Sequence, residues 1–214
     1  MNLDMAAAHR ERVLTAMDPR GVLILRAGGE RTRSRDTHFK FRPDNDFWYT
    51  TAYPEPDAVA VFAPHHDDGP FVLFVRPRDP ELETWNGRRA GIDGAVERFG
   101  ADTAYPIEEL SRQLPELLRG ADTLYLHTGR DAEFEREVLG CASTLNDRSR
   151  DGVMAPHAVI DPATLLNELR LFKSADELEL MRRAAAITDE AFRAAMKTLA
   201  PGVFEYEIEA VVDG

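Results

Sequence analysis

The chain has 214 residues, of which 43% are hydrophobic, enough for one large domain or for one domain and part of another. Its formal net charge of −12 argues against sequence-independent binding of nucleic acid, which needs a basic surface to displace counterions from phosphates. Cys141 is the only cysteine, so no intramolecular disulfide can form and a reducing compartment is expected.

The N-terminus lacks the pattern of a secretory signal, because charged side chains interrupt residues 1–17 where an unbroken apolar region would be needed. No stretch approaches the ~20 apolar residues that a membrane span requires. We therefore expect a cytoplasmic protein with neither a membrane nor a nucleic acid as partner.

In chain order, residues 4–17 have the pattern of an amphipathic helix, and residues 22–25 form a short apolar run typical of a buried strand. Residues 28–46 are polar and rich in arginine. This segment is long for a structureless loop, so we expect it to be functional or folded onto the body of the domain. A short helical turn follows, with Asp44 or Asn45 as its cap.

Two further apolar runs, 58–62 and 71–75, are separated by a polar turn and predict adjacent antiparallel strands. The other predicted elements of this part are helices at 91–99, 107–118 and 132–139 and a strand at 123–126. The alternation predicts an α/β domain with a mixed sheet and flanking helices over residues 1–160.

A boundary is expected after this domain. Asp161-Pro162 predicts the start of a connecting helix within residues 161–173. The third region, 174–214, begins with the serine and glutamate of a capping box, Ser174 and Glu177, and predicts a long helix to about residue 200. One face of that helix is apolar with little chain left to cover it, so it either belongs to a second domain whose remainder is absent or lies against a partner subunit. We expect another copy of the chain to cover it, giving a homo-oligomer.

Groups with catalytic potential are sparse. The turn His65-His66-Asp67-Asp68 contains metal-capable side chains, but consecutive residues cannot all face one ion, which favours a solvated turn. Cys141 has no basic neighbour in the sequence to lower its pKa, which favours an inert, partly buried thiol. The isolated histidines are interpreted as structural. They are His38, His127 and His157.

Two segments stand out by their composition. Residues 32–58 contain the run Asp46-Phe47-Trp48-Tyr49, and residues 83–91 contain Trp85-Asn86-Gly87-Arg88-Arg89. Aromatic rings beside guanidinium groups suit a surface where rings pack and arginines stack or pair, such as a subunit interface.

Both segments, in this order, resemble the N-terminal domain of bacterial aminopeptidase P, an Xaa-Pro aminopeptidase of the creatinase and prolidase superfamily. Residues 170–174 and 182–184, followed by 201–206, resemble the start of that family's catalytic domain. The resemblance implies that residues 174–214 are the beginning of an incomplete pita-bread domain. It also implies release of the N-terminal residue from peptides with proline in second place.

The resemblance further implies two divalent metal ions, typically manganese, held by two aspartates, a histidine and two glutamates. No residue of this chain matches those ligands, so no catalytic or metal-binding residue is assigned and this chain alone is expected to be non-catalytic. In tetrameric relatives the aromatic of the WxGRR loop reaches a neighbouring subunit's active site. This assigns Trp85, Arg88 and Arg89 to substrate enclosure and the interface, with peptide as a partner only when the catalytic half is present.

Two alternatives stay open. The first concerns Trp85, which would pack against its own domain and have no role in substrate enclosure. The second concerns the whole chain, which would be a stand-alone protein-binding module, as in pseudo-peptidase relatives that lack metals. We expect an N-terminal piece of a longer protein, with Trp85 largely exposed while Arg88 and Arg89 find partners within their own domain.

Overall fold

A computed structural model describes residues 2–67, 69–147, 150 and 152–214. These residues form two compact units, one over Asn2–Leu171 and the other over Phe172–Gly214. The first unit therefore extends beyond residue 160 and includes the helix that follows Asp161-Pro162. Among the described residues, no helix is both long and apolar enough to cross a membrane.

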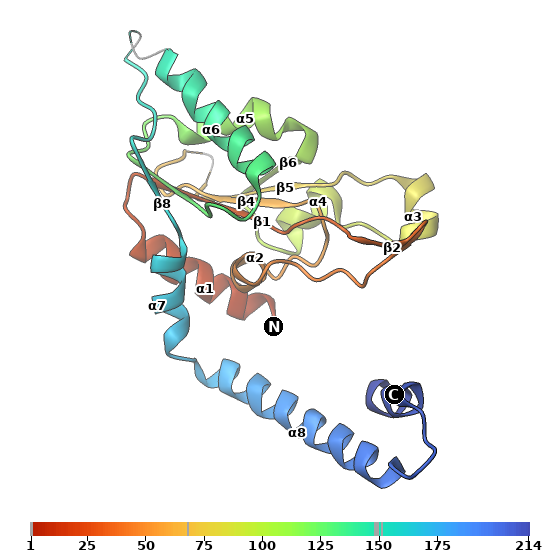
Figure 1. Cartoon of the computed structure of the whole chain (residues 1–214). Helices are drawn as coiled ribbons and strands as arrows, with labels where there is room; N and C mark the ends of the chain where they lie inside the picture. Colours follow the sequence, from red (N-terminus) through yellow and green to blue (C-terminus); the bar gives the residue numbers. More distant parts are fainter. Residues whose placement is uncertain (1, 68, 148–149, 151) are drawn as a thin grey trace. The chain divides into compact units, whose positions relative to one another are not determined.

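The first unit is a mixed α/β domain (Figure 1). Its elements are α1 (Leu3–Ala16), β1 (Gly21–Arg26), β2 (Thr32–Ser34), β3 (Thr37–His38), α2 (Asn45–Thr51), β4 (Val59–Phe62), β5 (Phe71–Val75), α3 (Pro80–Asn86), α4 (Gly91–Glu97), β6 (Thr103–Pro106), a 3-10 turn (Ile107–Glu109), α5 (Leu110–Leu118), β7 (Thr123–Leu126), α6 (Ala132–Asp147), β8 (Ala158–Ile160) and α7 (Ala163–Leu171).

Six strands form one sheet in the order β6-β5-β4-β1-β7-β8. The central strand β1 pairs antiparallel with β4 and parallel with β7, and β4 and β5 form the antiparallel pair that the sequence predicts. Because β1 and β7 run in the same direction, the segments that follow Arg26 and Leu126 leave the sheet at the same edge. That edge carries the polar clusters described below.

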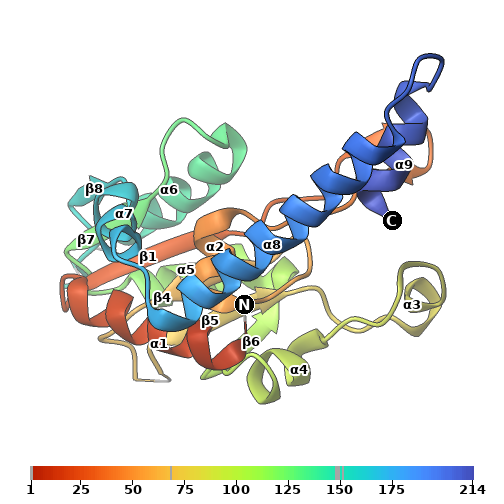
Figure 2. The ribbon, with the colours of Figure 1, turned by 90° about the horizontal axis from the view of Figure 1, so that it is seen from below.

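Both faces of the sheet are covered, which explains why its central strands are continuously apolar. On β1, Val22 and Ile24 join the core under α5 and α6, whereas Leu23 and Leu25 join the core beneath α1, α2 and α7. The helices on the two sides are visible in Figure 1, and Figure 2 shows the domain from the side of α1. Alternate residues of one strand thus supply two hydrophobic cores.

The polar segment 28–46 contains the small hairpin β2–β3, whose residues are exposed, and then returns to the body. The backbone N–H of Asp44 donates to the carbonyl of Ala27 at 2.9 Å, which fixes the return. Asp44 then caps α2 by accepting from the N–H groups of Asp46 and Phe47 at 2.8 and 3.3 Å. Of the two predicted caps, Asp44 is the one used.

The second unit contains α8 (Ala175–Thr198) and α9 (Glu205–Asp213). The predicted capping box is confirmed, because the side chain of Ser174 accepts from Glu177 N–H at 3.2 Å and the side chain of Glu177 accepts from Ser174 N–H at 2.8 Å. No residue of α8 is buried. Ile187, which lies on the predicted apolar stripe, is 60% exposed.

Candidate functional site

The loop that carries Trp85 is built around the short helix α3. Asp79 caps the helix by accepting from the N–H groups of Glu81 and Leu82, both at 3.1 Å, and Pro80 occupies the first turn. Gly87 ends it with φ of +83°, a conformation that favours glycine. No residue of α3 is buried, and Trp85 is 86% exposed. The helix therefore presents the indole ring away from its own domain.

The two ends of this loop are tied together. Arg89 donates from Nη1 to the carbonyl of Pro77 at 3.1 Å, and the N–H of Ala90 donates to Oε1 of Glu55 at 2.6 Å. Nearby, burial and the Glu55 carboxylate raise the pKa of the Tyr53 phenol, which therefore stays protonated. The neck of the loop is thus fixed to the domain while its tip is exposed.

Arg78 and Glu83 brace the loop from within. The guanidinium donates to both carboxylate oxygens, at 3.1 and 3.0 Å, and these hydrogen bonds lower the pKa of Glu83. Arg89 has the partner within its own domain that the sequence led us to expect. Arg88 does not, since its exposed guanidinium makes no hydrogen bond or ion pair with another residue that the structure describes.

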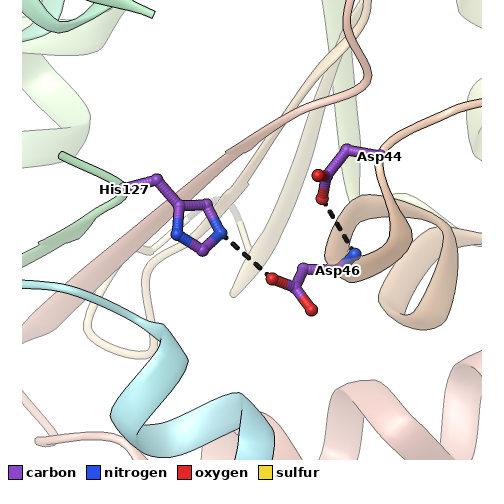
Figure 3. A group of neighbouring side chains, drawn as sticks. All are labelled: Asp44, Asp46 and His127. Atoms are coloured by element: carbon purple, nitrogen blue, oxygen red, sulfur yellow. Dashed lines mark hydrogen bonds and ion pairs between the residues drawn. The ribbon is translucent and has the colours of Figure 1, made fainter. Parts of the chain in front are cut away.

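A second cluster lies at the start of α2, beside the edge where β7 ends (Figure 3). Asp46 is only 6% exposed, and its Oδ2 lies 3.1 Å from Nε2 of His127. The other ring nitrogen of His127 lies 3.3 Å from Oδ1 of Asp161. Arg170 donates to Oδ1 of Asp46, and Arg130 lies 3.6 Å from Asp44. Asp161 precedes α7, and its Oδ1 also accepts from the N–H of Ala163 at 2.8 Å. This carboxylate therefore connects α7 to the network.

The charges of this cluster compensate one another. Burial by itself would raise the pKa of Asp46, but the contacts with His127, Arg170 and Arg130 outweigh burial, and the pKa lies below its ordinary value. Asp161 behaves similarly: burial raises its pKa, whereas the N–H of Ala163 and the His127 ring lower it, with a net decrease. Both carboxylates are therefore held in their charged forms.

The cluster also has the geometry of a metal site in one respect, because Asp44, Asp46 and His127 offer donor atoms within 4.8 Å of one another. The surrounding charges do not fit a divalent ion. Both oxygens of Asp46 already face Arg170, His127 or Arg130, and one oxygen of Asp44 caps α2. Two guanidinium groups beside these carboxylates would repel a dication. We interpret the cluster as an ion-pair network that joins α2, α7 and the segment after β7.

Of the isolated histidines, His127 has a carboxylate beside each ring nitrogen, which fits the structural role predicted for it, although its buried Nε2 contacts Asp46 as an ion pair without hydrogen-bond geometry. The prediction is wrong for His38 and His157, which are exposed and whose rings make no hydrogen bond or ion pair to another described residue. Cys141 is buried, and burial followed by the nearby Glu137 raises its pKa, as expected for an inert thiol.

The turn after β4 is less solvated than predicted. Both ring nitrogens of His65 are buried without a partner among the described residues, and Asp68 lies outside those residues. The turn packs against the chain before β6, since a Cβ placed on Gly69 would meet Asp102 at 2.2 Å. Oδ2 of Asp102 also accepts from Phe71 N–H at 2.9 Å, so this packing holds the turn against the domain.

Comparison with known proteins identifies the family. Residues 6–125 match the family described as Aminopeptidase P, N-terminal domain, and residues 179–214 match Metallopeptidase family M24. The first match covers more than half of the chain, so the chain belongs to the aminopeptidase P N-terminal domain family. The resemblance drawn from the sequence is confirmed.

Individual relatives agree with this assignment. The Xaa-Pro aminopeptidase of Escherichia coli (strain K12) is 38% identical over 204 residues, covering 95% of this chain and 46% of that protein. The Xaa-Pro aminopeptidase of Haemophilus influenzae is 35% identical over 205 residues, covering 94% and 44%. The chain therefore spans about half the length of the relatives it matches, and it corresponds to the N-terminal part of Xaa-Pro aminopeptidase-like proteins.

Solved structures confirm the mixed α/β fold. Aminopeptidase PepP of Pseudomonas aeruginosa superposes with a TM-score of 0.94 at 38% identity, covering 100% of this chain and 48% of that one. The Zn-substituted Escherichia coli aminopeptidase P in complex with product gives a TM-score of 0.92 at 37% identity, covering 99% and 48%.

Proposed function

We propose that this chain is the N-terminal part of an Xaa-Pro aminopeptidase, a hydrolase that releases the N-terminal residue of a peptide whose second residue is proline. The observation that carries the proposal is the likeness to aminopeptidase PepP, which extends over the whole chain at 38% identity with a TM-score of 0.94. A likeness of this extent includes the Trp85 loop as well as the core of the domain.

The metal centre of such an enzyme is proposed to lie in its M24 domain, to which residues 179–214 belong by sequence. Two divalent ions, manganese in the proposal, would there lower the pKa of a bound water so that it attacks at neutral pH. Asp44, Asp46 and His127 are the described residues grouped closely enough for a metal, and arginines already neutralise them. We therefore propose that residues 1–214 alone are not catalytic.

The contribution of this part is substrate enclosure and assembly in a cytoplasmic homo-oligomer. Support comes from the loop described above, where a braced neck holds Trp85 86% exposed. A rigid scaffold that presents one aromatic side chain is typical of loops that complete a binding site elsewhere. Arg88, exposed and without a partner among the described residues, is available to the same neighbouring surface.

The test has two arms. Purified residues 1–214 with added manganese are expected to show no hydrolysis of Xaa-Pro peptides and no stoichiometric metal. The second arm uses a longer protein, whose coding sequence continues in frame through an M24 domain with its acidic and histidine metal ligands. This longer protein is expected to cleave those peptides. Turnover that stays with the purified 1–214 chain would contradict the division of roles. A stop codon directly after Gly214 would favour the protein-binding module instead.

A further inference from the structure

A cavity of about 490 Å³ opens at the edge of the sheet where β1 and β7 end. The cavity is lined by the segment after β1, the end of β7 with His127, the start of α6 and the irregular segment of residues 39–44 that returns to the body. Ligands of α/β proteins bind preferentially beyond the carboxyl ends of parallel strands, and small-molecule sites have volumes of ~300–1,000 Å³. Position and size both suit a small molecule.

The cavity has the opposite charge to the protein around it. Five cationic side chains and three carboxylates line it, an excess of two positive charges in a chain whose net charge is −12. The cationic residues are Arg26, Arg31, Lys40, Arg42 and Arg130. A concave surface with an excess of one sign of charge attracts ligands of the other sign.

Three of these cations are uncommitted. Arg26 pairs with Asp131, and Arg130 lies near Asp44, so two of the five are neutralised within the domain. Arg31, Lys40 and Arg42 make no ion pair with any carboxylate in the part of the chain that the structure describes; Arg42 donates only to the neutral Asn45, at 3.1 Å. Clustered like charges repel one another, and a bound anion would relieve that repulsion.

The remaining wall is apolar, with the rings of Phe39, Phe41 and Phe134. The guanidinium of Arg26 lies over the Phe134 ring, 5.2 Å from its centroid, so one cation and one ring are held in a fixed relation. A bare inorganic ion would leave most of this volume unfilled. The excess of positive charge in the cavity would repel a divalent metal ion.

We propose that this cavity binds a small organic anion, a carboxylate or phosphate group carried on an aromatic or aliphatic body. The anionic group lies against Arg31, Lys40 and Arg42, whose donors match oxyanion geometry, and the body packs on the phenylalanine rings. The site is formed by residues 24–135 alone and is separate from the Trp85 loop in sequence. It does not depend on peptidase activity.

Titration calorimetry on residues 1–214 with phenyl phosphate and with benzoate tests the proposal. Saturable binding of at least one of them is expected, and the tighter of the two identifies the preferred head group. Inorganic phosphate, which lacks the body, and benzyl alcohol, which lacks the charge, are each expected to bind at least tenfold more weakly.

The double variant R31Q/K40Q is expected to weaken the tighter anion at least tenfold. The matched control is R35Q/R136Q, which removes the same charge at two exposed residues that do not line the cavity, and it is expected to change affinity less than threefold. Circular dichroism checks that both variants fold. Absence of saturable binding of either anion at about 10 mM, well above the weak ~1 mM range, would overturn the proposal. Equal effects of the two double variants, or benzyl alcohol binding as tightly as the anions, would also overturn it.

Discussion

Replacing Trp85 by alanine should leave the stability of residues 1–214 almost unchanged. A tryptophan side chain can bury up to ~250 Å². With the residue 86% exposed, the area that the domain covers is on the order of ~35 Å². At ~25 cal/mol per Å², the loss is about 1 kcal/mol at most. In a domain of this size that corresponds to a fall in melting temperature of roughly 2–4 °C.

A matched control comes from the same class of side chain in the core. Phe47 on α2 is fully buried, and truncating a buried phenylalanine to alanine typically costs ~3–5 kcal/mol. Thermal unfolding followed by circular dichroism should therefore separate Trp85→Ala from Phe47→Ala clearly. If Trp85→Ala lowers the melting temperature as much as Phe47→Ala does, the side chain belongs to the core of its own domain and has no role as a presented residue.

The same substitution has a second readout in a protein that includes the complete M24 domain. There, Trp85→Ala should weaken Xaa-Pro cleavage while the melting temperature still changes little, because the ring is proposed to enclose substrate in a neighbouring subunit. Unchanged cleavage together with unchanged stability would show that the exposed ring neither encloses the substrate nor stabilises its own domain.

Two further predictions concern the ion-pair network and α8. Asp46→Asn should destabilise the domain by about 2 kcal/mol at neutral pH, because it removes the buried carboxylate that pairs with His127 and with the half-buried Arg170. Since the folded pKa of Asp46 is lowered, its stabilisation is present above the ordinary carboxyl pKa and is lost as pH falls through the folded value. Melting temperatures measured between pH 7 and acid should thus fall less steeply for the variant, and parallel curves would refute this. On α8, light scattering at tens of micromolar should show a dimer or larger assembly. Ile187→Asp should dissociate it, whereas Ala185→Asp on the opposite side of the helix should not, and a wild-type monomer would contradict the assembly.

The sequence by itself determined the elements whose burial or hydrogen bonding is visible in the local pattern of residues. Strands β1, β4, β5 and β7 were identified from continuous apolar runs because both faces of the sheet are covered. The capping box of α8 was also readable, since all its hydrogen bonds lie within four consecutive residues. The motifs at residues 46–49 and 85–89 were sufficient to identify the family, because related proteins share such residue patterns by descent.

Only the tertiary structure decided the elements that lack such a pattern. The edge strands β6 and β8 were missed because they are short and only partly buried, and α3 was missed because it has no apolar face. The hairpin β2–β3 is exposed on both faces, so no alternation marks it.

The polar sites show the same division. Asp46 and Arg170 are 124 residues apart in the chain, and nothing local in either segment indicates that they meet. The cavity draws its cations from three separate segments, which chain folding brings to one edge of the sheet. Charge compensation and charge excess depend on distances between segments, and those distances are fixed by the pairing of β1 with β7 and the packing of α2 and α7.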